Sequence, residues 1–456
     1  MSAPGDVHAT SPYPSPRYAW YVAAILTVAN ASSFVDRQIL GLLVAPIRRD
    51  LGVTDTQIGV LYGLAFAAFF TLLGVPIGRL ADRSSRRMII GFGIAAWSGM
   101  TIACGLARTY EQLLLARFGV AIGEATLAAP AMSILADYFP RERRATVLSV
   151  FAIGVYAGAG LANLIGGALL LQASATGSVV WPIVGEIRDW QRVFVIVGLP
   201  GLLIAALIAT VREPVRRETG QRDDAAAFGV SDVLAYVRAN RRTYVCHSLG
   251  YALFALVNYA GAAWFPTMIM RTFGWTPART GITLGILTVT LGVIGVVVGG
   301  RVADALLARG YTDAKLRVGI IAAVANLACG TVFLLAPTAG IAIAALVPYN
   351  FFASFAFGAA VAAIQEITPN RMRAQVGAAV MSTLTLIGLG LGPSVVGLIT
   401  DRVFNDDAAV RYSLLIVTIV GLSAAASLLT AGLAPYRRSV AYRASWPGPV
   451  TASEIR

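Results

Sequence analysis

Long apolar segments separated by short polar loops recur along the whole chain. Twelve of them are long enough to cross the hydrocarbon core of a bilayer, which takes about 20 residues of α-helix. Apolar and polar residues do not alternate in ten-residue segments, as they would in a membrane β-barrel. We therefore expect an all-α integral membrane protein with transmembrane helices near residues 18–45, 57–79, 88–107, 111–136, 145–171, 192–212, 243–270, 280–300, 317–336, 338–364, 374–400 and 412–433.

The two halves of the chain repeat one pattern. GRLADRSSRR at 78–87 follows the second segment, and GRVADALLAR at 300–309 follows the eighth. FPRERRA at 139–145 and TPNRMRA at 368–374 form a second matched pair. Matched loops in two sets of six helices predict two pseudo-symmetric six-helix bundles, a transporter architecture whose substrate site lies near the midplane between the repeats.

These repeats define the expected domains. The first tail, rich in Pro and Ser, is expected to be disordered, and a polar stretch in the middle of the chain is expected to be a linker that includes a surface helix near 230–238. The boundaries are 1–17 for the cytoplasmic N-terminal tail, 18–212 for the first bundle, 213–242 for the cytoplasmic linker, 243–435 for the second bundle and 436–456 for the cytoplasmic C-terminal tail.

The charge distribution indicates an orientation in the membrane. The net charge is +13, yet only 13% of the residues are charged and 57% are hydrophobic. Most Lys and Arg residues lie in the loops on the side of the two termini, as the positive-inside rule requires of cytoplasmic loops. We expect a multi-pass protein of the inner (plasma) membrane with both termini cytoplasmic, and no nucleic-acid partner.

Four charged residues interrupt the apolar segments: Asp36 and Arg37 in the first, Arg117 and Glu124 in the fourth. A charge near the bilayer centre costs at least about 2.5–3.5 kcal/mol, so these residues are the first candidates for a functional site. Arg117 and Glu124 are seven positions apart and share one helix face. The depths of the four residues along their helices place Arg37 within reach of Glu124, and Asp36 within reach of Arg117. Two interpretations stay open: a neutral network that locks two helices together, or a switch in which a carboxylate gains a proton when its Arg partner changes.

Two sets of residues resemble known families. GRLADRSSRR at 78–87 resembles the signature loop of the major facilitator superfamily, with Ser85 where that loop usually has glycine. NASSFVDRQIL at 30–40 together with RFGVAIGEA at 117–125 resembles the Spinster group of lipid transporters within that superfamily. An Asp-Arg pair in the first helix also occurs among organic-anion:proton symporters. The resemblance implies alternating access by two six-helix bundles and a sphingoid phosphate or lysophospholipid as substrate.

The site follows from the charges and from the resemblance. Arg37 and Arg117 would hold an anionic headgroup, with Glu124 as the first choice for the proton-coupling acid and Asp36 as the second. Aromatic and amide residues of helices 7 and 10 would line the substrate cavity: Tyr251, Phe254, Asn258 and Asn350. The resemblance assigns gating to the residues of the signature loop and its second copy: Asp82, Arg83, Arg86, Arg87 and Asp304.

The expected function is therefore proton-coupled secondary transport of an amphipathic anionic lipid. The alternatives are a symporter of protons with an organic anion such as a carboxylate or a sugar acid, and a non-transporting membrane receptor on the same fold. The sequence contains no P-loop, nucleophile or metal-ligand motif, so we expect no enzyme, no cofactor and no metal. The expected partners are the small amphipathic substrate, protons and membrane lipids, and the chain is expected to be a monomer. His247, at the inner end of helix 7, is expected at the membrane interface.

Overall fold

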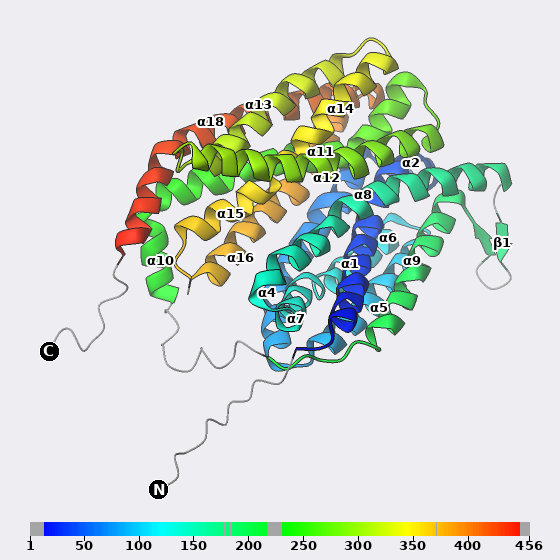
Figure 1. Ribbon diagram of the computed structural model, residues 1–456. Coiled ribbons are helices and arrows are strands. Elements are labelled where there is room, and N and C mark those ends of the chain that lie inside the picture. The colour runs from blue at the N-terminus through cyan, green and yellow to red at the C-terminus, as the bar shows by residue number, and fades with distance from the viewer. Residues whose placement is uncertain (1–12, 177–178, 182–184, 217–229, 371, 447–456) are drawn as a thin grey trace, which may run out of the picture.

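Twelve helical spans arranged as two bundles make up the computed structural model, which describes residues 13–176, 179–181, 185–216, 230–370 and 372–446. The two bundles lie side by side, and the first helix begins and the last helix ends at the same end of the molecule (Figure 1). We call the other end of the bundles the distal end. Each of the twelve expected segments corresponds to one span, so the predicted fold class is confirmed.

The first bundle contains six spans, several of which are interrupted. Its elements are α1 (Pro16–Gln38), η1 (Ile39–Leu42), α2 (Val44–Leu51), α3 (Asp55–Gly59), η2 (Val60–Leu64), α4 (Ala65–Arg83), α5 (Arg86–Cys104), α6 (Tyr110–Glu124), α7 (Ala128–Tyr138), α8 (Arg141–Thr176) and α9 (Asp189–Ile208). A two-stranded antiparallel hairpin, β1 (Val179–Trp181) and β2 (Gly185–Ile187), lies between α8 and α9 and is a small addition to the all-α fold that we expected.

The second bundle follows a short helix in the linker. Its elements are α10 (Val230–Ala239), α11 (Arg241–Phe273), α12 (Pro277–Ala308), α13 (Ala314–Leu335), α14 (Ala339–Phe355), α15 (Phe357–Ile367), α16 (Arg373–Leu384), η4 (Thr385–Leu391), α17 (Gly392–Ile399), η5 (Thr400–Phe404), η6 (Asp407–Ala409) and α18 (Val410–Ser445). The expected linker helix is α10, which is anchored to the bundle because the Tyr236 hydroxyl donates to the Ile367 carbonyl at 2.7 Å.

The last helix is longer than the sequence suggested. We expected the second bundle to end at residue 435 and a tail to follow, but α18 continues through Pro435 to Ser445. Tyr436 is fully buried, and its hydroxyl donates to a carboxylate oxygen of Glu366 at 2.6 Å. This tertiary contact, together with an Arg443 hydrogen bond to the Glu366 carbonyl, holds the helix together past the proline. At the other end of the chain, α1 begins at Pro16, and residues 1–12 lie outside the described part.

Glycines bring the two bundles into close contact along α8 and α12. A Cβ on Gly281 of α12 would lie 2.3 Å from the Asn163 carbonyl oxygen, and one on Gly285 would lie 2.8 Å from the Gly160 carbonyl oxygen. Small residues of this kind let helix backbones approach each other in membranes. The α17 segment packs in the same way on α3 and η2 of the first bundle. The glycine-rich fifth span (α8) and the eleventh span, which includes α17, therefore form part of the interface between the bundles.

Candidate functional site

The four intramembrane charges lie together in the first bundle. The closest pair is an ion pair between α1 and α6, with Arg37 Nη2 2.6 Å from Glu124 Oε2. Both side chains are almost completely buried, at 8% and 1% exposure. The predicted proximity of Arg37 and Glu124 is therefore observed.

The second pair differs from the expected one. Arg117 donates from Nη1 to the backbone carbonyl oxygen of Asp36 at 3.1 Å, and not to the Asp36 carboxylate. Neither carboxylate oxygen of Asp36 has a hydrogen-bond partner among the described residues, although Trp97 and Thr101 of α5 lie beside it. The sequence could place Asp36 and Arg117 at similar depths, but it could not show which oxygen of Asp36 would face the guanidinium.

The two guanidinium groups keep unused donors. Arg37 Nε, Arg117 Nε and Arg117 Nη2 are buried and have no hydrogen-bond partner among the described residues. Buried donors without partners cost free energy, and hydrogen bonds from charged donors to an anion are among the strongest in proteins. These three donors are not used by the Arg37–Glu124 pair, so they remain available for hydrogen bonds to an anion. We call Asp36, Arg37, Arg117 and Glu124 the charged cluster.

Aromatic rings enclose the charged cluster. The Arg37 Cζ atom lies 4.6 Å from the Phe34 ring centroid, 4.5 Å from that of Phe66 and 5.5 Å from that of Phe70. Arg117 lies 5.7 Å from the Phe66 centroid. Rings stacked on a guanidinium stabilise its charge when water is excluded. The enclosure therefore holds both cations in place while the neighbouring carboxylates balance their charge.

The charged cluster lies where three helices lose regular α geometry. The first span changes to the 3₁₀ segment η1 directly after Gln38, and α6 ends at Glu124 before the span resumes as α7. The second span passes through the π-helical segment η2, which carries the buried Tyr62. Interrupted helices frequently mark binding sites in transporters. The interruption after Glu124 was not predicted, because no proline or paired glycine directly follows that residue.

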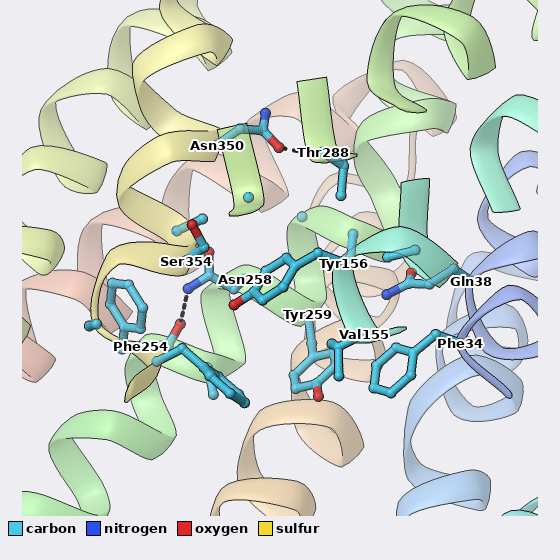
Figure 2. A pocket seen from close by; sticks show the side chains of 18 of the residues that line it. Phe34, Gln38, Val155, Tyr156, Phe254, Asn258, Tyr259, Thr288, Asn350 and Ser354 are labelled. Atoms are coloured by element: carbon cyan, nitrogen blue, oxygen red, sulfur yellow. Dashed lines mark hydrogen bonds between the residues drawn. The ribbon is translucent and has the colours of Figure 1, made fainter. Parts of the chain in front are cut away.

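A cavity of about 330 Å³ lies between the two bundles. Among the described residues, its wall is made of aromatic and amide side chains from both bundles and contains no charged residue (Figure 2). Four of the predicted substrate-binding residues line it: Tyr251, Phe254, Asn258 and Asn350. Arg37 and Arg117 do not line it, so in this conformation the cavity and the charged cluster are separate compartments.

Polar groups in the cavity wall are only partly paired. Asn258 donates to the Phe254 carbonyl at 2.9 Å, which leaves its Oδ1 atom without a partner among the described residues. Thr288 donates to Asn350 Oδ1 at 3.5 Å, near the distance limit for a hydrogen bond (Figure 2). The sequence missed Tyr156, which lines the cavity together with Tyr259. Their positions on α8 and α11 become informative only when the two helices are known to face each other.

The signature loop connects elements within the first bundle. Arg86 is buried and donates to Glu213 Oε1 at 2.8 Å and to Asp137 Oδ2 at 2.5 Å, and the Arg87 amide donates to Glu213 Oε2 at 2.9 Å. Arg83 and Asp304 are exposed, and the side chain of Asp82 lies outside the described residues. None of the hydrogen bonds observed for Arg86 and Arg87 crosses to the second bundle. Their role in gating stays a prediction.

The distal end holds contacts between the bundles that the sequence did not suggest. Asp55 of α3 is fully buried and pairs with Arg271 of α11 at 2.6 Å, while Arg48 pairs with Asp407 at 2.5 Å. Asp401 accepts hydrogen bonds from the Thr56 amide and hydroxyl, both at 2.6 Å. We call these five residues (Arg48, Asp55, Arg271, Asp401 and Asp407) the distal clasp. The three carboxylates approach one another, but cations and amide groups already satisfy them.

His247, which we expected at the membrane interface, is covered by protein on all sides. It is fully buried within the second bundle, and its Nε2 lies 2.9 Å from the Ala360 carbonyl oxygen. Its ring also contacts that of Tyr251 at a centroid distance of 4.8 Å. The sequence did not predict this burial, because it depends on α15 and α18, which pack against α11.

Similarity to known proteins agrees with this architecture. The model of the Major Facilitator Superfamily matches residues 26–393. An MFS-type efflux pump of Mycolicibacterium smegmatis is 29% identical over 442 residues, which cover 93% of this chain and 95% of the relative. The sphingosine-1-phosphate transporter SPNS2 of Danio rerio is 27% identical over 292 residues, or 61% of this chain and 55% of the relative.

A solved structure extends the comparison to the whole fold. The inward-facing, unoccupied crystal structure of a bacterial homologue of the human lysosomal transporter Spinster superposes with a TM-score of 0.75 and 27% identity. The superposition covers 94% of this chain and 98% of the other. The predicted resemblance is confirmed: the chain belongs to the Major Facilitator Superfamily and is related to its Spinster transporters.

Proposed function

We propose that this protein is a proton-coupled secondary transporter of an amphipathic anion, of the lysophospholipid or sphingoid-phosphate type. One observation carries the proposal: the charged cluster holds three unpartnered guanidinium N–H donors beside two carboxylates, inside a transporter fold. A phosphate group is the ligand that such donors favour. The name of the SPNS2 relative, a sphingosine-1-phosphate transporter, points to the same substrate class.

The proposed coupling uses the competition between two anions for Arg37. In the state described here Glu124 accepts a hydrogen bond from Arg37 Nη2. When Glu124 takes up a proton, its attraction to Arg37 falls, and the guanidinium becomes available to the headgroup. When Glu124 loses that proton, the carboxylate competes with the headgroup and favours its release. Substrate and proton therefore stabilise the same state of the cluster, which is the thermodynamic requirement for coupling.

The cavity is suited to the apolar part of such a substrate. Its uncharged wall of aromatic, amide and hydroxyl groups would take an acyl or sphingoid chain, with Asn258 and Asn350 available to hydroxyl or amide groups near the head. The distal clasp closes the end away from the termini, so we assign this conformation as inward-facing with cytoplasmic termini. Alternating access would open the clasp and close the opposite end.

The test is uptake into proteoliposomes with an imposed proton gradient. Glu124→Gln removes the titrating proton and keeps an amide oxygen for Arg37. We expect gradient-driven transport of a lysophospholipid or sphingoid phosphate to stop while purified protein stays monodisperse. Unchanged gradient-driven transport in Glu124→Gln would contradict the role of Glu124. Asp36→Asn would then test the second candidate for the proton-coupling acid.

A second candidate function is export of uncharged amphipathic compounds. The absence of charge from the cavity wall favours it, as does the name of the efflux-pump relative. The two functions differ in their dependence on the arginines. A thermal-shift screen of purified protein should separate them, since phosphorylated lipids are expected to stabilise the wild type more than Arg117→Lys, whereas uncharged compounds should stabilise both equally.

A further inference from the structure

The cavity and the charged cluster are separated at one point by a single aromatic ring. Phe34 lines the cavity, and the same ring lies 4.6 Å from the Cζ atom of Arg37. Figure 2 shows Phe34 and Gln38 projecting from α1 toward the cavity. Arg37 does not line the cavity, and its side chain is only 8% exposed. A ligand in the cavity therefore meets the ring of Phe34 before it meets the guanidinium.

Phe34 differs from the other rings stacked on Arg37 because it lines the cavity. Phe66 is fully buried and stacks on Arg37 at 4.5 Å, and of the three rings stacked on Arg37 only Phe34 lines the cavity. Gln38, next to Phe34 on the cavity wall, accepts a hydrogen bond from the buried hydroxyl of Tyr62. Phe34 itself is half-buried. Phe34 is therefore the stacked ring that a ligand in the cavity would contact.

The backbone below Phe34 is held in place. A Cβ on Gly158 of α8 would lie 2.7 Å from the Phe34 Cβ and 2.2 Å from the Ala31 carbonyl oxygen, so α8 contacts α1 tightly there. The backbone cannot shift easily in such a contact. Rotation of the side chain toward the cavity is the motion that remains, and an aromatic ring has only two side-chain torsions to change.

We propose that Phe34 is a shutter between the cavity and the charged cluster. Its ring covers Arg37 when the cavity is empty, and it must rotate away before an anionic headgroup can bind the guanidinium. While the shutter is closed it also keeps cavity water from Glu124, so that protons do not cross without substrate. This inference rests on the proposed function. Phe34 acts by controlling access to Arg37 and Glu124.

The first test measures the reactivity of Arg37 in purified protein without any lipid substrate. Phenylglyoxal modifies accessible guanidinium groups, and peptide mass spectrometry reports each arginine separately. The exposed Arg402 serves as an internal standard, and the fully buried Arg117 as an internal negative control. We expect the rate at Arg37 to rise at least tenfold in Phe34→Ala and to stay unchanged in the matched variant Phe254→Ala, which also removes a ring from the cavity wall.

Equal rates in wild type and Phe34→Ala would overturn the proposal, and so would an equal rise in Phe254→Ala, which would indicate general loosening of the cavity. If Phe34→Ala does not yield monodisperse protein, Phe34→Val keeps an apolar side chain and must shift the rate in the same direction. Because no lipid is present, this result stands whether or not the protein transports lipids. Failure of the shutter and failure of the proposed function are thus distinguishable.

The second test measures proton leak. In proteoliposomes that contain a pH-sensitive dye and no substrate, Phe34→Ala should dissipate an imposed pH gradient several-fold faster than wild type. Adding Glu124→Gln to Phe34→Ala should restore the wild-type rate, which a purely structural role of Phe34 would not do. A Phe34→Ala protein that leaks no faster than wild type, or a leak that persists in the double variant, would overturn the role of Phe34 in guarding Glu124.

Discussion

Arg271 and Asp55 join the two bundles through two parallel hydrogen bonds, from Nη1 to Oδ2 at 2.6 Å and from Nη2 to Oδ1 at 2.9 Å. The residues lie 216 positions apart, at the distal ends of α11 and α3. Asp55 is fully buried, and Arg48 contacts its Oδ1 atom at 3.2 Å. A planar, two-point contact of this kind is strong and depends on geometry. In this structure it links the two bundles at the closed distal end.

Removing this contact should destabilise the distally closed state. Truncating one partner of a buried ion pair costs about 2–5 kcal/mol. We therefore expect Arg271→Ala to shift the equilibrium toward the distally open state by at least about 30-fold, at 1.4 kcal/mol per factor of ten. Distances between spin labels on α3 and α17 would measure the populations. Arg279→Ala is the matched control, because it removes an exposed cation at the same end whose ring partner, Trp275, belongs to its own bundle. A similar shift in both variants would contradict the conclusion that the Arg271–Asp55 contact stabilises the distally closed state.

Close backbone contact at the distal end leads to a second prediction. A Cβ on Gly59 would lie 2.6 Å from the Pro393 carbonyl oxygen and 2.8 Å from the Ser394 Cα, both of α17. Since neither backbone atom can move cheaply, Gly59→Ala should disfavour distal closure by about 1–3 kcal/mol, the usual cost of overpacking. Gly74→Ala on the same span meets nothing within 4 Å and should leave the populations unchanged. Distances between spin labels on α3 and α17 would measure this effect as well. Unaltered distances in Gly59→Ala would show that α3 and α17 do not separate at this contact.

Glu213 gives a pH-dependent prediction outside the membrane. Partial burial raises the pKa of its carboxyl, but hydrogen bonds from the Arg87 amide, Arg86 and Ser85 outweigh burial and hold the pKa below its ordinary value of 4.5. A carboxylate with a lowered pKa stabilises the fold above the ordinary value, and this stabilisation is lost as the pH falls through the lowered pKa. Because Glu213 is partly exposed, we expect it to contribute less than about 1 kcal/mol to the free energy of unfolding.

The measurement for Glu213 is a comparison of melting temperatures in detergent. Glu213→Gln should melt below wild type at pH 7, and the difference should shrink as the pH falls below about 4.5. Glu186→Gln, which changes an exposed carboxylate on β2, should match wild type at both pH values. A difference for Glu213→Gln that is constant with pH would show that charge is not what stabilises this loop.

The sequence predicted the fold well because each span carries its own signal. About 20 apolar residues are enough to define a membrane helix, and the repeated loops at 78–87 and 300–309 revealed the two bundles. The Arg37–Glu124 pair was also predictable, because helical periodicity and depth place both residues within reach. Such local signals need no knowledge of how the bundles face each other.

The remaining features of the site depend on packing between elements that are distant in sequence. The Arg271–Asp55 contact joins the ends of two helices that carry no recognisable pairing signal, and Tyr259 enters the cavity only because α11 faces the first bundle. The sequence also placed Arg37 with the cavity-lining residues, whereas Phe34 covers it in the structure. A helical period identifies a face, but it cannot say which of two neighbouring side chains will cover the other.

The unpartnered donors of Arg117 lead to a last prediction, on headgroup selection. Arg117 uses Nη1 to hold the Asp36 carbonyl and leaves Nε and Nη2 free. Arg117→Lys keeps the positive charge beside Asp36 and Glu124 but lacks the planar set of donors that binds phosphate at two points. Loss of one charge-assisted hydrogen bond costs about 1.5–3 kcal/mol, so affinity for sphingoid phosphates should fall by about 10–150-fold. Affinity for the dephosphorylated alcohols should stay unchanged, and calorimetric titration of both would measure the contrast. An equal loss for phosphates and alcohols would mean that Arg117 supports the fold and does not select the headgroup.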